Sequence, residues 1–268
     1  MLLKSRKASK YSLPPTAIIS TLLFFLLLIY TGQALLAESS SENKTSWQMG
    51  LSTDLFNRGV KLGSDKLTLK SLSFLLEARA MNLPGLFDLD LYAGLNKSKL
   101  NGALFDHLPI TLDYEAGYIS GLIFGGKISK GLLKSSNFRF GLTADFTTYI
   151  GFKKTYTLSD FVVPANVQAE PDWAMASGGI FVLYDGFVDN QPFLEITFSK
   201  LWGTFKVTET IQDLTGQQSK NLKDAGPLSL TLGWNINLTK DIIFIPRVRI
   251  YTGSRTTIGA GLSLLYAL

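Results

Sequence analysis

Apolar and polar residues alternate with a period of two along most of this chain from residue 46 onwards. In the clearest case, residues 256–268, every even position from 258 is apolar, and the odd positions from 257 to 263 are small or polar. Such alternation is typical of a β-strand whose two faces meet different surroundings. No segment after residue 37 sustains the 3.6-residue period of a helix, so we predict an all-β fold. The ten predicted strands are 47–55, 72–80, 87–96, 108–118 (which can extend to 127), 138–146, 173–184 (apolar on both faces, so its register stays open), 194–202, 228–238, 242–251 and 256–268.

The connections between these segments alternate in length. If the barrel begins in the periplasm, longer connections fall on the outside and shorter ones on the inside, except for the last connection. Outer-membrane barrels have this asymmetry, together with an even number of strands, whereas a soluble sandwich has no reason to sort its loops in this way. We therefore predict a membrane-spanning antiparallel up-and-down β-barrel of about ten strands. The predicted connections are 57–66, 81–85, 97–107, 128–136, 151–172, 185–191, 207–226, 239–241 and 253–255.

Aromatic residues on the apolar face support the same prediction. Seven of them come from seven different segments, and we expect all of them near the periplasmic end, where a barrel carries an interfacial girdle. The core of a sandwich would not collect its aromatic residues at one end. They are Trp47, Phe87, Phe124, Phe138, Trp234, Phe244 and Tyr266.

Residues 1–37 have the pattern of an export signal. Four basic residues lie within the first ten, an apolar run follows at 17–30, and small residues lead up to Ala37. This order is typical of a secretory signal peptide, with cleavage after Ala34 or Ala37. The alternative is an uncleaved anchor, which needs about 20 apolar residues, and polar residues interrupt the run. We predict a signal peptide at 1–37 and an outer-membrane β-barrel at 38–268.

Charge and composition exclude several classes of function. The chain has 26 basic and 21 acidic residues, and four of the basic ones belong to the predicted signal, which leaves 22 against 21. A nucleic-acid partner is therefore not expected. Without cysteine and with a single histidine, we expect no metal site and no cofactor. That histidine, His107, is interpreted as a rim residue, so we expect no enzyme.

Charged residues on the predicted inner face form the candidate site. Acids are concentrated on the third and fourth predicted strands, and an arginine pair on the ninth lies across the barrel from them. One interpretation is a network of ion pairs that braces the interior, because buried charges need partners. The other is an electrostatic constriction in a narrow pore. The candidate pore-lining residues are Asp88, Asp90, Asp113, Glu115, Arg139, Asp145, Glu195, Arg247 and Arg249.

The end of the first predicted strand carries a family resemblance. Residues 53–60, T-D-L-F-N-R-G-V, resemble the S-D-Y-x-x-R-G-V opening of the TorF-like porins. The spacing of Asp54, Arg58, Gly59 and Val60 fits, positions 53 and 55 depart from the pattern, and only the first twenty or so residues of the predicted barrel are covered. The resemblance implies a small porin-like protein of the outer membrane and transfers no catalytic residue.

We expect a narrow channel in the bacterial outer membrane that passes small polar solutes or ions. The alternative is a non-conducting structural or surface-interaction barrel that acts through its extracellular loops. Expected partners are outer-membrane lipid and the barrel-assembly machinery, for which Tyr266 and Leu268 on the last strand form a candidate signal. Lys200 interrupts the apolar face of the seventh strand and is expected to reach lipid phosphates or to reflect a shifted register.

Overall fold

The computed structural model describes residues 45–85, 87–100, 102–106, 112–114, 117–158, 165–252 and 256–268. The chain divides into two units, residues 1–44 and residues 45–268, and the described residues all belong to the second. The predicted signal peptide at 1–37 therefore lies outside the described residues and stays a prediction. The described residues include no helix that is long and apolar enough to span a membrane.

The described part of the chain is built from antiparallel strands. They are β1 (Ser46–Leu62), β2 (Asp65–Leu83), β3 (Phe87–Leu100), β4 (Ala103–Phe105), β5 (Leu112–Tyr114), β6 (Ile119–Ser135), β7 (Phe138–Gly151), β8 (Lys154–Leu158), β9 (Ala165–Tyr184), β10 (Asn190–Ile211), β11 (Leu214–Asp224), β12 (Leu228–Asn237), β13 (Ile242–Tyr251) and β14 (Thr257–Ala267).

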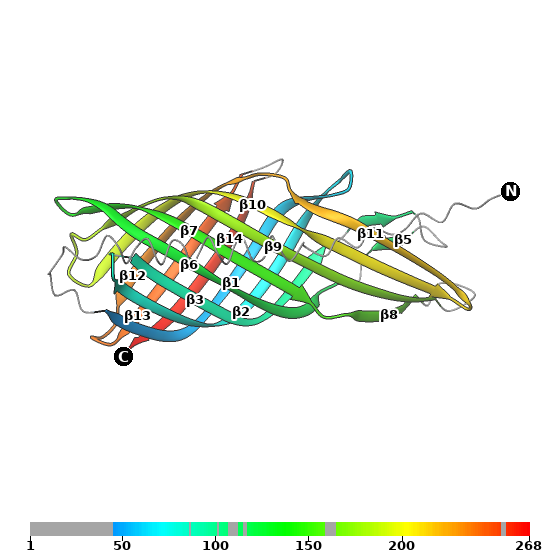
Figure 1. The fold of residues 1–268 in the computed structure, drawn as a ribbon, viewed down its shortest axis with the longest axis horizontal. Helices are drawn as coiled ribbons and strands as arrows, with labels where there is room; N and C mark the ends of the chain where they lie inside the picture. Colours follow the sequence, from blue (N-terminus) through cyan, green and yellow to red (C-terminus); the bar gives the residue numbers. More distant parts are fainter. Residues whose placement is uncertain are drawn as a thin grey trace. The chain divides into compact units, whose positions relative to one another are not determined.

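Ten of these strands pair into a closed ring in the order β1-β2-β3-β6-β7-β9-β10-β12-β13-β14 (Figure 1). The ring closes where β14 pairs with β1, from Gln48 opposite Ala267 to Leu55 opposite Ala260. Neighbouring strands of the ring are antiparallel. The ring strands also follow one another in sequence order, if β4, β5, β8 and β11 in the connections are left aside. The prediction of an antiparallel up-and-down barrel of about ten strands is therefore confirmed.

The two ends of the ring differ in their connections. At the end that we call the short-turn end, the connections are 84–86, 136–137, 185–189 and 238–241. At the opposite end, which we call the long-loop end, they are 63–64, 101–118, 152–164, 212–227 and 252–256, and three of these contain further strands.

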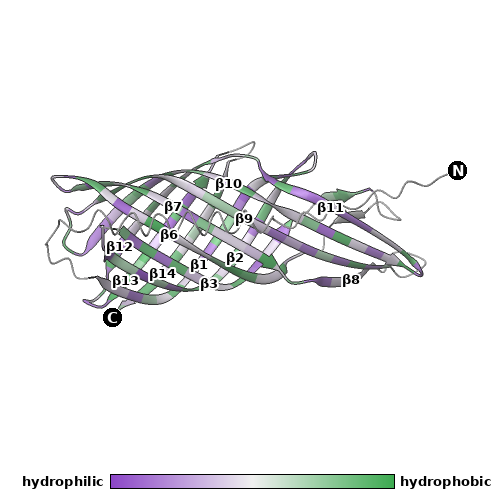
Figure 2. Ribbon diagram, viewed as in Figure 1, coloured by the Kyte–Doolittle hydropathy of each residue, from purple (hydrophilic) through white to green (hydrophobic). Residues whose placement is uncertain are grey.

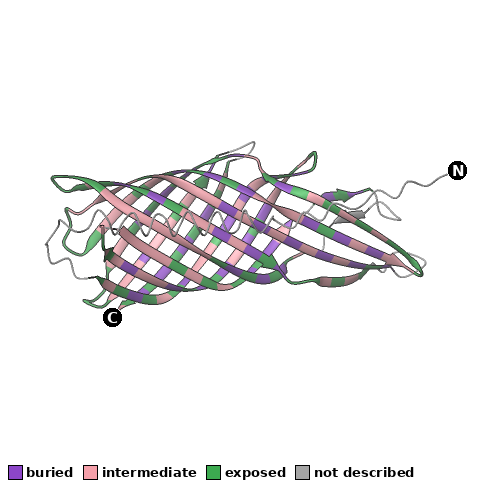
Figure 3. Ribbon diagram, viewed as in Figure 1, coloured by how far each residue is buried: buried purple, intermediate pink, exposed green. Residues whose placement is uncertain are grey.

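The two faces of the wall strands differ in the way that the alternation predicts. On β1, Trp47 and Leu51 point outwards and are 51% and 64% exposed. Gln48 and Ser52 point inwards and are 5% and 6% exposed. Hydrophobic and hydrophilic residues alternate along the strands in Figure 2, and buried and exposed residues alternate in the same way in Figure 3. Near the short-turn end, the outside of the wall is therefore apolar and the inside is polar.

Strand β11 reduces the number of strands in the ring towards the long-loop end. β12, β13 and β14 have 10, 10 and 11 residues, whereas β9 and β10 have 20 and 22. Beyond the ends of these three strands, β11 pairs with β10 at residues 202–211 and with β1 at Val60–Leu62. One strand replaces three, so that the ring of ten becomes a ring of eight. Figure 1 shows β9, β10 and β11 running on past β12 and β13.

The alternation reverses its phase at the level where the ring narrows. On β1 the outward residues are apolar up to Leu55, and from Phe56 onwards the large apolar residues point inwards. On β10 the outward apolar row is interrupted after Phe198 by Lys200 and is polar from Thr204 onwards, with Trp202 between them, while the inward row becomes apolar at Leu201. In this narrower part the inside of the wall is apolar and the outside is polar.

Several predicted connections are wrong because they consist largely of strand. Residues 128–135 belong to β6, and residues 154–158 and 165–172 belong to β8 and β9. The reversal explains two further cases. Residues 57–66 are not a loop, because β1 continues to Leu62 and the two-residue turn Gly63–Ser64 leads into β2. Residues 207–226 likewise contain the end of β10 and the whole of β11. A strand whose apolar residues change face loses its simple alternation in the sequence, although its backbone pairing continues.

The predicted strand at 108–127 is also wrong in its first half. Wall strand β6 begins only at Ile119, and β5 pairs instead with β4 in a separate two-stranded sheet. Gly117 lies between β5 and β6 in the sequence and adopts a φ of 73°, in the left-handed region that favours glycine. A regular strand does not continue through such a residue. Because β6 then runs to Ser135, Phe124 lies in the middle of the barrel wall and not near the short-turn end, where we had expected it.

Two glycines on β1 provide a test of the closure of the ring. A Cβ atom at Gly50 would overlap the carbonyl group of Leu264 on β14, whereas one at Gly59 would lie 3.7 Å from Ala225, an ordinary contact. We therefore expect Gly50→Ala to disturb the β1–β14 pairing and to lower the yield of folded barrel, because backbone cannot move aside cheaply. Gly59→Ala is the matched control. The yield is measured as the fraction that resists unfolding in unboiled gel samples, and equal yields would contradict this account.

Candidate functional site

A cavity of about 230 Å³ lies inside the ten-stranded part of the barrel. Its walls carry most of the charged residues that the sequence predicted to face inwards. The predicted residues that line it are Asp88, Asp90, Arg139, Asp145, Glu195, Arg247 and Arg249. Further charged residues on its walls are Asp54, Glu77, Arg79 and Lys127.

Arg79 on β2 joins the first group of charges in the cavity. Its Nε donates to Oδ1 of Asp90 on β3 at 2.7 Å, and its Nη2 donates to Glu77 at 3.3 Å. Glu77 in turn accepts a hydrogen bond from the Ser263 hydroxyl on β14 at 3.0 Å. This group therefore ties β14 to β2 and β3 across β1, because β1 lies between β2 and β14.

Ion pairs also cross the rest of the cavity. Lys127 on β6 pairs with Glu195 on β10, and Arg247 on β13 lies 3.5 Å from a carboxylate oxygen of Asp54 on β1. These contacts favour the bracing interpretation of the inner charges, because each base that they involve has an acid as its partner.

Arg249 and Asp145 are held by neutral partners as well. Arg249 donates from Nε to the Thr231 hydroxyl at 3.2 Å and from Nη1 to the Tyr251 hydroxyl at 3.0 Å. Asp145 accepts a hydrogen bond from the Tyr92 hydroxyl at 3.0 Å. Both side chains are therefore fixed in orientation by the walls.

Four aromatic side chains lie on the side of the cavity towards the long-loop end, and two of them, Phe56 and Trp173, line it. Tyr149 on β7 stacks on Trp173 on β9 at 5.5 Å, and Trp173 stacks on Phe56 on β1 at 5.7 Å. Phe56 meets the ring of Tyr251 on β13 edge-on at 5.3 Å. We call these four residues the aromatic layer. They are 1–5% exposed and form a continuous row of rings from one wall of the barrel to another.

Polar contacts lock the aromatic layer into the wall. The Tyr149 hydroxyl donates to the carbonyl of Ile119 at 2.9 Å, and the Trp173 indole lies 3.4 Å from the hydroxyl of Ser98. The guanidinium of Arg58 lies 5.2 Å from the centre of the Tyr251 ring. The rings are therefore anchored to two further wall strands, β3 and β6, and to Arg58 on β1, as well as packed against each other.

Arg58 itself is buried on the far side of the aromatic layer and pairs with Asp224 on β11. It also contacts Met175 at 3.0 Å and donates to the hydroxyl of Ser199 at 2.8 Å. The pair links β1 to the strand that narrows the ring. The sequence analysis missed it, because both residues fell in segments that were predicted as loops. Asp54 and Arg58, the two charged residues of the sequence T-D-L-F-N-R, both point inwards from β1.

An apolar core fills the eight-stranded part beyond Arg58. Phe205 on β10 contacts Phe105 on β4 at 5.8 Å, and both are buried. The hairpin of β4 and β5 therefore contributes to this core, and Lys220 on β11 donates to the carbonyl of Leu104. Nearby, burial raises the pKa of the Tyr156 phenol on β8, and the charge of Glu209 raises it further.

One predicted residue lies away from the barrel wall, and two lie outside the described residues. Asp113 belongs to β5 and not to the barrel wall, so the predicted row of acids on a fourth wall strand is wrong. Glu115 and His107 lie outside the described residues. Among the described residues, no three histidine, cysteine or acidic side chains are grouped closely enough to hold a metal ion. Lys200 is outward-facing and exposed, as the alternation predicted.

No family model matches this sequence, and no curated protein matches it. Among solved structures, the chain is similar to the outer membrane protease OmpT of Escherichia coli, with 13% identity, coverage of 86% of this chain and 99% of that one, and a TM-score of 0.42. It is also similar to the attachment invasion locus protein Ail of Yersinia pestis, with 9% identity, coverage of 84% and 97%, and a TM-score of 0.32. The toluene transporter TodX of Pseudomonas putida has 12% identity, coverage of 85% and 68%, and a TM-score of 0.35. With TM-scores below 0.5, these likenesses assign no function to the chain.

The ion pairs of the cavity predict a difference between two acids. Asp90→Ala should lower the free energy of unfolding by about 3 kcal/mol, near the cost of leaving a buried charge without its partner. Asp185→Ala is the matched control, because its partner Arg139 is 40% exposed, and the loss should stay below about 1 kcal/mol. Urea unfolding in detergent micelles measures both, and equal losses would contradict a bracing role for Asp90.

Proposed function

We propose that this protein is a β-barrel of the bacterial outer membrane whose interior is closed by side chains and which acts through its long-loop end. The membrane location is supported by the apolar outer surface. Leu51 on β1, Leu76 on β2 and Leu95 on β3 are 64%, 69% and 59% exposed on adjacent strands. An exposed apolar area of this extent needs an apolar partner, and a closed ring leaves no unpaired strand edge in lipid.

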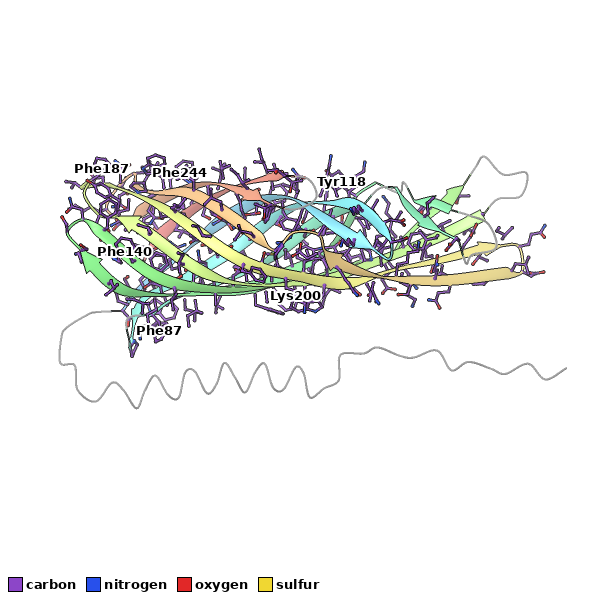
Figure 4. The ribbon with its side chains drawn as sticks, turned by 90° about the horizontal axis from the view of Figure 1, so that it is seen from above. Phe87, Tyr118, Phe140, Phe187, Lys200 and Phe244 are labelled. Atoms are coloured by element: carbon purple, nitrogen blue, oxygen red, sulfur yellow. The ribbon has the colours of Figure 1, made fainter. Side chains whose placement is uncertain are left out.

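The height of the apolar surface also fits a membrane. β12, β13 and β14 have 10, 10 and 11 residues, and a strand that crosses a bilayer needs about 9–11. Aromatic side chains gather at the short-turn end, and a tyrosine and a lysine lie farther along the barrel, near the other boundary of the apolar surface. In Figure 4 these are Phe87, Phe140, Phe187 and Phe244 at the short-turn end, and Tyr118 and Lys200 farther along.

The aromatic layer is the single observation that carries the proposal of a closed interior. A solute that entered the charged cavity would have to pass the four packed rings, then the buried Arg58 pair, and then an apolar core. We infer that the barrel does not conduct in this conformation. A structural or surface-interaction role then falls to the long-loop end, where β8, β9, β10 and β11 extend beyond the shorter strands.

A narrow channel is the second candidate, because the charged cavity favours it. Arg247 and Arg249 would favour anions at their level of the pore, and the resemblance of residues 53–60 to the TorF-like porins also favours a channel. Conduction would require the aromatic layer and the apolar core to move together. The first candidate needs no such movement, and we therefore prefer it.

The proposed location predicts where the mature protein is found. It should fractionate with outer membranes, and its gel mobility should shift on boiling, since a closed barrel resists unfolding by detergent. The N-terminus of the membrane-bound form should lie after Ala34 or Ala37. Recovery as a free periplasmic protein, or a membrane form that still begins at Met1, would be evidence against the proposal.

The closed interior predicts the outcome of planar-bilayer recordings. The wild-type protein should insert without discrete conductance steps, because the aromatic layer blocks the path. If steps do appear, the channel candidate replaces the first one. In that case Arg247→Glu with Arg249→Glu should move the ion preference towards cations, as measured by the reversal potential in a salt gradient.

A further inference from the structure

Lysines gather on the outer surface beyond the apolar area, on β10, β11, β1, β2 and β3. They come from adjacent strands, since β11 pairs with both β10 and β1, and β2 with both β1 and β3. We call this group the lysine arc. It consists of Lys61, Lys66, Lys70, Lys99, Lys200 and Lys223.

Five of the six members of the lysine arc lie directly opposite another member across the strands, whereas Lys200 lies opposite Ala176. Lys61 on β1 is paired in register with Lys66 on β2 and with Lys223 on β11. Lys70 on β2 is paired with Lys99 on β3. The Cβ atoms of such pairs are about 4.5–5.5 Å apart, and like charges in these positions destabilise a sheet. A bound anion would remove this cost.

Acidic side chains of the described residues do not neutralise the central row. None of the ion pairs between described residues includes Lys61, Lys66 or Lys223, and all three side chains are exposed. Outward acids at a similar level lie elsewhere on the ring, as with Glu170 and Asp172 on β9. Glu170 lies directly opposite Lys206 on β10, so these acids adjoin one end of the lysine arc.

The lysine arc follows the boundary of the apolar outer surface. The outward row of β2 changes from Leu72 to Lys70, and that of β10 changes from Phe198 to Lys200. At this height a lysine can keep its alkyl stem along the apolar wall and place its ammonium group among lipid headgroups. Other exposed lysines, among them Lys97, Lys153 and Lys206, also lie beyond the apolar surface, but the lysines paired in register with one another are those of the arc.

We propose that the lysine arc binds the phosphate groups of anionic lipid headgroups in the leaflet that surrounds the long-loop end. The row Lys223-Lys61-Lys66 forms its centre, because three ammonium groups can converge there on a single phosphate. The inference rests on the proposed location in the outer membrane, because the arc meets headgroups only if the apolar surface below it lies in lipid.

Binding of lipid A to the folded barrel in mixed micelles tests the proposal. Wild-type protein should retain bisphosphorylated lipid A and should lose it with increasing salt, because the attraction is electrostatic. Each lysine near an anionic surface contributes about fivefold to binding. Lys61→Gln with Lys223→Gln should therefore weaken binding by about thirtyfold. The matched control is Lys134→Gln with Lys240→Gln, two exposed lysines at the short-turn end, which should bind like the wild type.

Three results would overturn the proposal. They are equal binding of dephosphorylated lipid A, equal affinities of the two double variants, and displacement of lipid A by an equal concentration of free inorganic phosphate. Gel mobility before and after boiling confirms that each variant is folded. A wild-type barrel that fails to insert into phosphatidylcholine vesicles would refute the membrane location as well. A barrel that inserts into these vesicles but binds lipid A equally well with and without its phosphates would refute only the proposed role of the lysine arc.

Discussion

The number of strands in a closed sheet sets the width of its interior, and the rest of this structure depends on that constraint. An interior enclosed by about eight strands is just wide enough for side chains to fill, and a wider ring leaves space. Here ten strands surround the charged cavity, and the replacement of β12, β13 and β14 by β11 leaves eight around the apolar core. The aromatic layer lies at the change between the two. Cavity and core are therefore consequences of where three strands end.

The same change explains how far the sequence could predict the fold. Strict alternation marks the part of each strand that faces an apolar exterior. From this pattern the sequence predicted a ring of about ten strands that follow one another in sequence order. Beyond Leu55 on β1 and Phe198 on β10, the outside becomes polar and the inside apolar. A period-two pattern that changes phase resembles the end of a strand. The extensions of β1, β2 and β10 and the whole of β11 were therefore hidden among the predicted loops.

The candidate site was predictable to a similar degree and for similar reasons. Asp90, Glu195 and Arg247 lie on regular parts of their strands, so their inward orientation follows from the period alone. The identity of their partners does not follow from the period. Glu195 meets Lys127, which lies three strands away in the ring, only because of the register between the strands. Arg58 and Asp224 are 166 positions apart and meet only because β11 returns to β1. A short-range pattern contains no signal for such a return.

The junction between β1 and β11 has a consequence for the dynamics of the barrel. It consists of three residue pairs, whereas β1 and β14 are joined by eight. Local opening in proteins begins where few contacts have to break. The backbone amides at this junction should therefore exchange with solvent sooner than those of the β1–β14 seam. If β1 and β11 separate in the narrow part of the barrel, the ion pair between Arg58 and Asp224 has to break first.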